Sequence, residues 1–121
     1  MKYMFLIHHD EQAWNKRSDS ERQPILAEFR QLRQQLLSSG QYVDGSQLSP
    51  TASATSVRVR DGKPLVTDGP FAETREQLGG YFVVEAKDRE EALAIAAKIP
   101  VARWGTIEVR QLLDVPEPAT T

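Results

Sequence analysis

Short stretches of apolar residues, either continuous or alternating with polar residues, predict four β-strands of a sheet. The strands are expected at residues 2–8, 41–48, 80–86 and 104–113. The first and third are apolar on both faces, because large side chains fill successive positions such as Tyr3, Met4 and Phe5. Both faces of the sheet that contains them must therefore be covered.

A long helix is predicted between the first two strands, because apolar residues recur there every 3.6 positions up to Gly40. These residues are Ile25, Phe29, Leu32 and Leu36, flanked by Leu26 and Leu37. The start is open. Ser18 and Glu21 have the spacing of a capping box, but Pro24 would then lie inside the helix. We expect an irregular first turn or a start nearer Pro24, after a polar loop at residues 10–19.

A β-hairpin is predicted at residues 55–67, between the second and third strands of the sheet. Its turn is Asp61-Gly62, which lies between two alternating runs and is a strong hairpin signal. Val57 and Val59 alternate with arginines, so we expect one face of the hairpin to be in water.

A second helix is predicted between Asp88 and Pro100, which completes an α+β chain of the order βαββαβ with a β-hairpin insertion. This order is the ferredoxin-like plan. Two helices can cover only one face of a four-stranded sheet, and the other would expose apolar side chains to water, which soluble monomers avoid. We therefore predict a homodimer whose sheets pack face to face.

Composition and charge exclude several classes of protein. The 121 residues fit one domain, which we place at residues 1–115, with a flexible tail at 116–121. A net charge of −2 with scattered basic residues argues against nucleic acid as a partner. The absence of cysteine excludes disulfides and thiolate chemistry. The longest apolar run, Tyr3 to Ile7, is too short to span a membrane, and no signal peptide is evident, so a cytoplasmic protein is expected.

Charged residues on the last strand point to a polar cavity in the predicted dimer. Glu108 and Arg110 lie on the face opposite Ile107 and Val109, which suit the helix-covered core. Charged groups between two sheets must either form ion pairs or remain hydrated. That arrangement predicts either a salt bridge between subunits or a binding cavity with convergent polar groups.

His8 is the candidate for acid–base chemistry, because imidazole titrates near neutral pH and His8 shares a face with Met4 and Leu6. The alternative is that His8 and His9 merely end a strand at the surface, which we prefer for His9. Neighbouring strand residues point to opposite faces, so the two histidines cannot easily share one ion, and no metal site is predicted.

Residues 67–80 form a segment rich in turn and charged residues, of the kind that carries function on a rigid scaffold. Its core, Asp68-Gly69-Pro70-Phe71, followed by Glu73, resembles the DGPF branch of the YCII-related (YciI-like) family. Arg75 stands where that family often has lysine, which keeps the charge and changes the donor geometry. The resemblance extends from Tyr3 to about Leu112.

The resemblance implies a dimeric α/β barrel whose cleft pairs a histidine with an aspartate. Asp10 and Asp68 are both candidates for that aspartate, and the motif favours Asp68, although an aspartate before Gly-Pro is also a common turn device. Phe71 is either a core plug, which we prefer, or a pocket wall. Glu73 belongs to the motif, and Tyr81 offers either a phenol to a ligand or simple packing.

Two functions remain open. No nucleophile motif, phosphate-binding glycine loop or dinucleotide fingerprint is present, so no cofactor is predicted. The first hypothesis is a small organic molecule bound at the dimer interface, with His8 and Asp68 as the acid–base pair and with Asp10, Phe71, Glu73, Tyr81, Glu108 and Arg110 contacting the ligand. The second is a non-catalytic regulatory or protein-interaction module, because the DGPF branch resembles proteins that accompany extracytoplasmic-function sigma factors.

Overall fold

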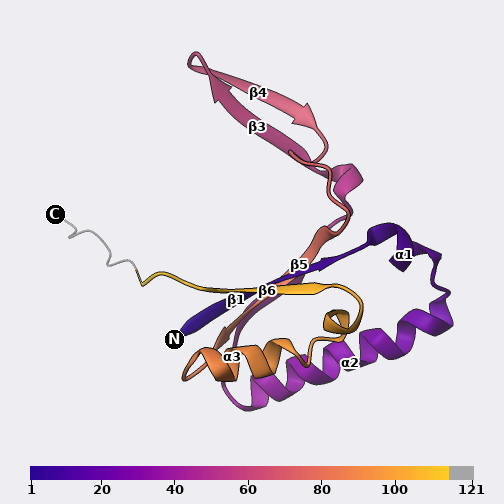
Figure 1. The fold of residues 1–121 in the computed structure, drawn as a ribbon, viewed down its shortest axis with the longest axis vertical. Helices are drawn as coiled ribbons and strands as arrows, with labels where there is room; N and C mark the ends of the chain where they lie inside the picture. The colour runs from indigo at the N-terminus through magenta and orange to yellow at the C-terminus, as the bar shows by residue number, and fades with distance from the viewer. Residues whose placement is uncertain (115–121) are drawn as a thin grey trace.

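A four-stranded antiparallel sheet with helices on one side forms the body of the chain (Figure 1). The computed structural model describes residues 1–114, so the predicted tail at 116–121 lies outside the described residues. The strands are β1 (Lys2–His9), β2 (Tyr42–Gln47), β3 (Thr55–Arg60), β4 (Lys63–Asp68), β5 (Gln77–Glu85) and β6 (Thr106–Gln111). The helices are α1 (Glu11–Lys16), α2 (Asp19–Ser38) and α3 (Arg89–Ala96), with short 3₁₀ turns at Thr51–Ser53 and Pro100–Arg103.

The order of strands in the sheet is β2-β5-β1-β6, and every neighbouring pair is antiparallel. This mixed α+β arrangement is compatible with the predicted ferredoxin-like plan. The ladder between β1 and β5 is irregular at one point, since Ile7 pairs with Gly80 while His8 pairs with Leu78. Gly79 is therefore the extra residue of a β-bulge.

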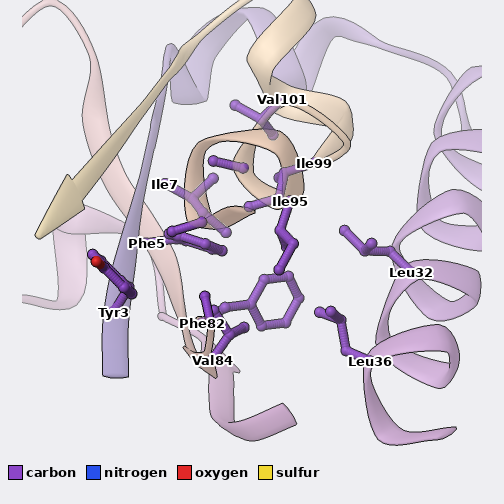
Figure 2. Packing of buried hydrophobic residues seen from close by; sticks show 13 residues of the cluster. Tyr3, Phe5, Ile7, Leu32, Leu36, Phe82, Val84, Ile95, Ile99 and Val101 are labelled. Atoms are coloured by element: carbon purple, nitrogen blue, oxygen red, sulfur yellow. The ribbon is translucent and has the colours of Figure 1, made fainter. Parts of the chain in front are cut away.

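The hydrophobic core lies between one face of the sheet and helices α2 and α3. Phe5 and Val84 point from the sheet toward Leu32 and Leu36 of α2 and toward Ile99 after α3 (Figure 2). Phe5, Val84 and Ile99 are completely buried. The period-two prediction for the faces of β1 is confirmed on this side, because alternate residues of that strand join the core.

The predicted polar loop at residues 10–19 is wrong over its first part, where the chain forms helix α1. Asp10 caps this helix, because its Oδ1 accepts hydrogen bonds from the backbone N–H groups of Gln12 (3.0 Å) and Ala13 (3.2 Å). The helix is six residues long and buries none of them fully, so it has no apolar stripe that periodicity could detect.

Helix α2 begins earlier and more regularly than expected. Its first residue is Asp19, and Ser18 and Glu21 form a complete capping box, so the alternatives of an irregular turn or a start near Pro24 are wrong. Pro24 lies inside the helix and leaves one carbonyl without its usual donor, on an exposed part of the first turns where water can replace it.

The capping box also affects the titration of Glu21. Hydrogen bonds from the backbone N–H and the hydroxyl of Ser18 hold the pKa of Glu21 below its ordinary value. A lowered pKa in the folded state stabilises the fold above the pKa of the unfolded chain, and this contribution is lost as the pH falls through the lowered folded value.

Strands β3 and β4 form the predicted hairpin, which extends away from the sheet (Figure 1). Asp61 (φ 52°) and Gly62 (φ 72°) both have positive φ, as a two-residue turn of type I′ requires. The expectation that only one face of the hairpin would be in water is wrong for the single chain. Val57 and Val66, which pair across the strands, are 61% and 66% exposed.

Removing the Ser18 cap is expected to destabilise the fold. Ser18→Ala takes away the side-chain acceptor for the Glu21 N–H and should lower the free energy of unfolding by about 1 kcal/mol, measured by urea denaturation. Ser38→Ala, at the exposed last residue of the same helix, is the matched control and should change it by a few tenths of a kcal/mol at most. Equal effects of the two substitutions would contradict the capping role.

Candidate functional site

The sheet face that points away from the helices carries four of the eight residues predicted to be functional, namely His8, Tyr81, Glu108 and Arg110. Its centre is apolar, because Met4 and Leu6 of β1 lie beside Val83 and Tyr81 of β5. Its two edges are polar. Asp44 and Ser46 come from β2, and Thr106, Glu108 and Arg110 come from β6. We call this surface, defined by these nine residues and His8, the uncovered face.

His8 and Glu108 form a pair on the uncovered face. The Nε2 of His8 lies 3.2 Å from the Oε1 of Glu108, with the two side chains 28% and 49% exposed. A carboxylate only accepts hydrogen bonds, so Nε2 must carry the proton and Nδ1 is left to accept or release another. A ring oriented in this way by a carboxylate is suited to proton transfer.

The register of β6 explains why Glu108 reaches His8. Glu108 is the direct partner of Leu6, and Thr106 is the direct partner of His8, so Glu108 is the diagonal neighbour of the imidazole. Thr106 in turn donates from its hydroxyl to Glu76 (2.8 Å), which ties the end of the loop before β5 to the same edge.

Tyr81 and Asp44 form a second polar pair on the other side of the apolar centre. The hydroxyl of Tyr81 donates to the Oδ2 of Asp44 at 3.1 Å. This hydrogen bond, together with the negative charge of Asp44, raises the pKa of Tyr81 above its ordinary value. The phenol is thus kept as a donor to a carboxylate acceptor.

Neither aspartate that the sequence offered as a partner for His8 contacts it. Asp10 is engaged in capping α1, and Asp68 ends β4, opposite Thr55 in the hairpin. Within residues 1–114, the carboxylate that contacts the imidazole is that of Glu108. The sequence had placed Glu108 on the correct face but had not paired it with His8, because the pairing depends on the register of two strands about a hundred positions apart.

The other predicted ligand contacts are spread over the surface. Arg110 lies on the uncovered face opposite Met4. Phe71 and Glu73 lie in the exposed loop after β4. Phe71 is 81% exposed, so the expectation that it plugs the core is wrong.

A cleft of about 420 Å³ lies on the helix side of the sheet, where the sequence had predicted no site. His9, which we had expected only to end a strand, lies in its wall, with its ring edge-on to Trp14 (6.3 Å between centroids). A signal for it in the sequence is Gly79-Gly80, because glycine within a strand marks a place where another group approaches the backbone closely.

Among residues 1–114, no three His, Asp or Glu side chains converge as a metal site requires. None of the helices in this range is both long enough and apolar enough to cross a bilayer.

Comparison with known proteins matches nearly the whole chain. The sequence model of the YCII-related domain matches residues 1–116. The chain is also 32% identical over 117 residues to "Uncharacterized protein R00369" of Rhizobium meliloti (strain 1021), which covers 93% of this chain and 92% of that protein. These matches do not distinguish the DGPF branch, which stays a prediction.

The pKa of Tyr81 offers a test of the geometry of the uncovered face. Asp44→Asn removes the charge next to the phenol and should lower the pKa of Tyr81 toward its ordinary value, measured as tyrosinate absorbance during an alkaline titration. Asp61→Asn in the hairpin turn removes the same charge and should leave the titration unchanged. Because the folded pKa is raised, the stabilising effect of the pair should be present at neutral pH and disappear as the pH rises through that folded value.

Proposed function

Because the chain belongs to the YCII-related family, we propose that two copies pack their uncovered faces together and enclose a cleft that binds a small organic molecule. In this arrangement the protein is a dimeric α/β barrel, and the hairpin β3–β4 is an insertion in each ferredoxin-like subunit. His8 and Glu108 are the acid–base pair of the cleft, in place of a histidine–aspartate pair.

The dimer is supported by the composition of the uncovered face. Its centre is made of the half-buried side chains of Met4 and Leu6 next to Val83, which is already buried in the single chain, and Leu78 and Leu112 at its margins are each 37% exposed. Burying such a surface contributes roughly 25 cal/mol per Å² of apolar area. A twofold axis would bring the same apolar centre of both copies together and leave the polar edges at the rim.

The observation that carries the proposed chemistry is the contact between His8 Nε2 and Glu108 Oε1 at 3.2 Å. Glu108 orients the ring, and the free Nδ1 takes a proton from the ligand or returns one to it. Arg110 on the same strand supplies a positive charge for an anionic group of the ligand. The reaction needs no bound cofactor, because only proton movement is assigned to these residues.

The exposed hairpin favours a second candidate, a protein-interaction module. Val57, Val59 and Val66 share one face of the hairpin and are each more than half exposed. An exposed apolar face on a two-stranded hairpin suits contact with another protein, such as a component of an extracytoplasmic-function sigma factor circuit. Pull-down of such a factor by the intact protein, and its loss in Val57→Ser with Val66→Ser, would favour this candidate.

A charge in the centre of the uncovered face is expected to dissociate the dimer. Leu6→Lys places an ammonium group in the proposed interface and should convert a dimer into a folded monomer, measured by sedimentation equilibrium with circular dichroism as the check on folding. Leu37→Lys, at a leucine of α2 that is 52% exposed, is the control and should remain a dimer. A wild-type protein that sediments as a monomer at micromolar concentration would rule out the interface.

Loss of the acid–base pair should release a co-purifying ligand. Native mass spectrometry of the wild-type dimer is expected to show an added small-molecule mass, which His8→Ala and Glu108→Gln should both lose. Asp68→Asn should retain it, because Asp68 lies in the hairpin. Retention in Glu108→Gln combined with loss in Asp68→Asn would favour the original histidine–aspartate hypothesis over the pair proposed here.

A further inference from the structure

The cleft on the helix side of the sheet lies across the sheet from the pair of His8 and Glu108, although Ser46 and Tyr81 of the uncovered face also border it. It lies between α1, the middle of α2 and the paired ends of β2 and β5. Ile7 and His9 of β1 line it, and successive side chains of a strand point to opposite faces, so His8 lies on the other side of the sheet. Its volume of about 420 Å³ is within the range of small-molecule pockets.

Aromatic side chains form the inner surface of this cleft. Phe82 of β5 lies with its ring centroid 6.4 Å from that of Phe29 on α2 and 6.1 Å from that of Tyr42 on β2. Trp14 of α1 lines the same cleft. Rings arranged at such distances offer both faces and edges to a further flat ring.

Glycines let the rings of the cleft pack directly against the strands. A Cβ at Gly79 would lie 2.5 Å from Nε2 of His9, and a Cβ at Gly45 would collide with the ring of Phe82 and lie 2.9 Å from the Tyr42 hydroxyl. Both glycines line the cleft. The positions of these rings in its wall therefore depend on the absence of a side chain at Gly45 and Gly79.

The rim of the cleft carries an excess of positive charge. Arg30 and Arg33 are exposed residues of α2 that line it, and the guanidinium carbon of Arg33 lies 5.3 Å from the ring centroid of Tyr42. Within residues 1–114, neither arginine takes part in an ion pair. The carboxylate of Glu11 also lines the cleft, but Thr51 already donates to both of its oxygens, from the backbone N–H at 3.0 Å and from the hydroxyl at 2.7 Å.

We infer that this cleft binds a small aromatic carboxylate. The ring of the ligand lies against Phe29, Phe82 and Tyr42, where its apolar surface is removed from water. Its carboxylate lies at the rim and accepts charge-assisted hydrogen bonds from Arg30 and Arg33. The combination of an aromatic floor with two guanidinium groups that form no ion pair within residues 1–114 selects an anionic ligand over a neutral one of the same shape.

The direct test uses 2-naphthoate and its neutral analogue 2-naphthamide as probes of the full chain. Isothermal titration calorimetry should show that 2-naphthoate binds and that 2-naphthamide binds at least about tenfold more weakly, because the amide forms no ion pair. Backbone amide shifts on addition of 2-naphthoate should be largest at Gly79, Gly80 and Phe82. No binding of 2-naphthoate, or equal affinity for the two probes, would overturn the inference.

Substitutions at the rim locate the charge that recognises the carboxylate. Arg30→Gln combined with Arg33→Gln should weaken 2-naphthoate binding by about tenfold or more and leave the weak binding of 2-naphthamide unchanged. Arg89→Gln, at an exposed arginine of α3, is the control and should bind like wild type. Unchanged affinity in the double variant would overturn the role of the arginines.

The apolar mouth provides a second, independent variant. Leu26 lines the cleft and is 37% exposed, whereas Leu37 lies farther along α2 outside it, so Leu26→Gln should weaken binding of the probe and Leu37→Gln should not. The folded monomer expected for Leu6→Lys should still bind 2-naphthoate, because the cleft lies within one chain. Loss of binding in that folded variant, or equal effects of Leu26→Gln and Leu37→Gln, would contradict the inference.

Discussion

The need to cover two faces of one sheet is the constraint from which the rest of this protein follows. Helices α2 and α3 bury one face, and Phe5 and Val84 become fully enclosed there. The same strands carry Met4, Leu6 and Val83 on the opposite face, where no helix lies. Hydrophobic burial thus assigns the core to one side, and in the dimer that we propose, chemistry on the other side would be shared by two chains.

Consecutive residues of strand β1 place their side chains on opposite faces of the sheet. His8 points to the uncovered face and contacts Glu108, whereas His9 points to the helix side and contacts the ring of Trp14. Period-two geometry separates two adjacent imidazoles into different environments, one beside a carboxylate and one beside an indole. The sheet therefore carries two independent candidate sites that share one strand.

Local periodicity made much of the fold predictable from the sequence. The faces of β1, the apolar stripe of α2 and the hairpin turn at Asp61-Gly62 all depend on residues a few positions apart. Helix α1 was not predicted because it is short and has no apolar face. The start of α2 differs from the prediction because the capping box of Ser18 and Glu21 begins the helix at Asp19 and Pro24 is tolerated inside it.

The sites were harder to predict, because they depend on the pairing register of strands that are far apart in the sequence and on the shape of a cleft between several elements. Glu108 reaches His8 only through the pairing of β1 with β6, which no local pattern specifies. The helix-side cleft is bounded by residues from five separate parts of the chain, and its aromatic wall needs glycine at positions 45 and 79, where a Cβ would collide with Phe82 or His9. An aspartate next to a histidine in the sequence, such as Asp10, is instead taken up by capping the helix that follows.

The bulge at Gly79 has a consequence for how the chain tolerates changes in length. The side-chain amide oxygen of Gln77, just before it, accepts the backbone N–H of Glu11 at 2.9 Å and so anchors the first turn of α1. Deleting Gly79 would move Gln77 and Leu78 each to the opposite face of the sheet from the one it now occupies. Gln77 would then no longer reach the N–H of Glu11. The bulge in β5 therefore holds the spacing on which the uncovered face and the helix side of the sheet both depend.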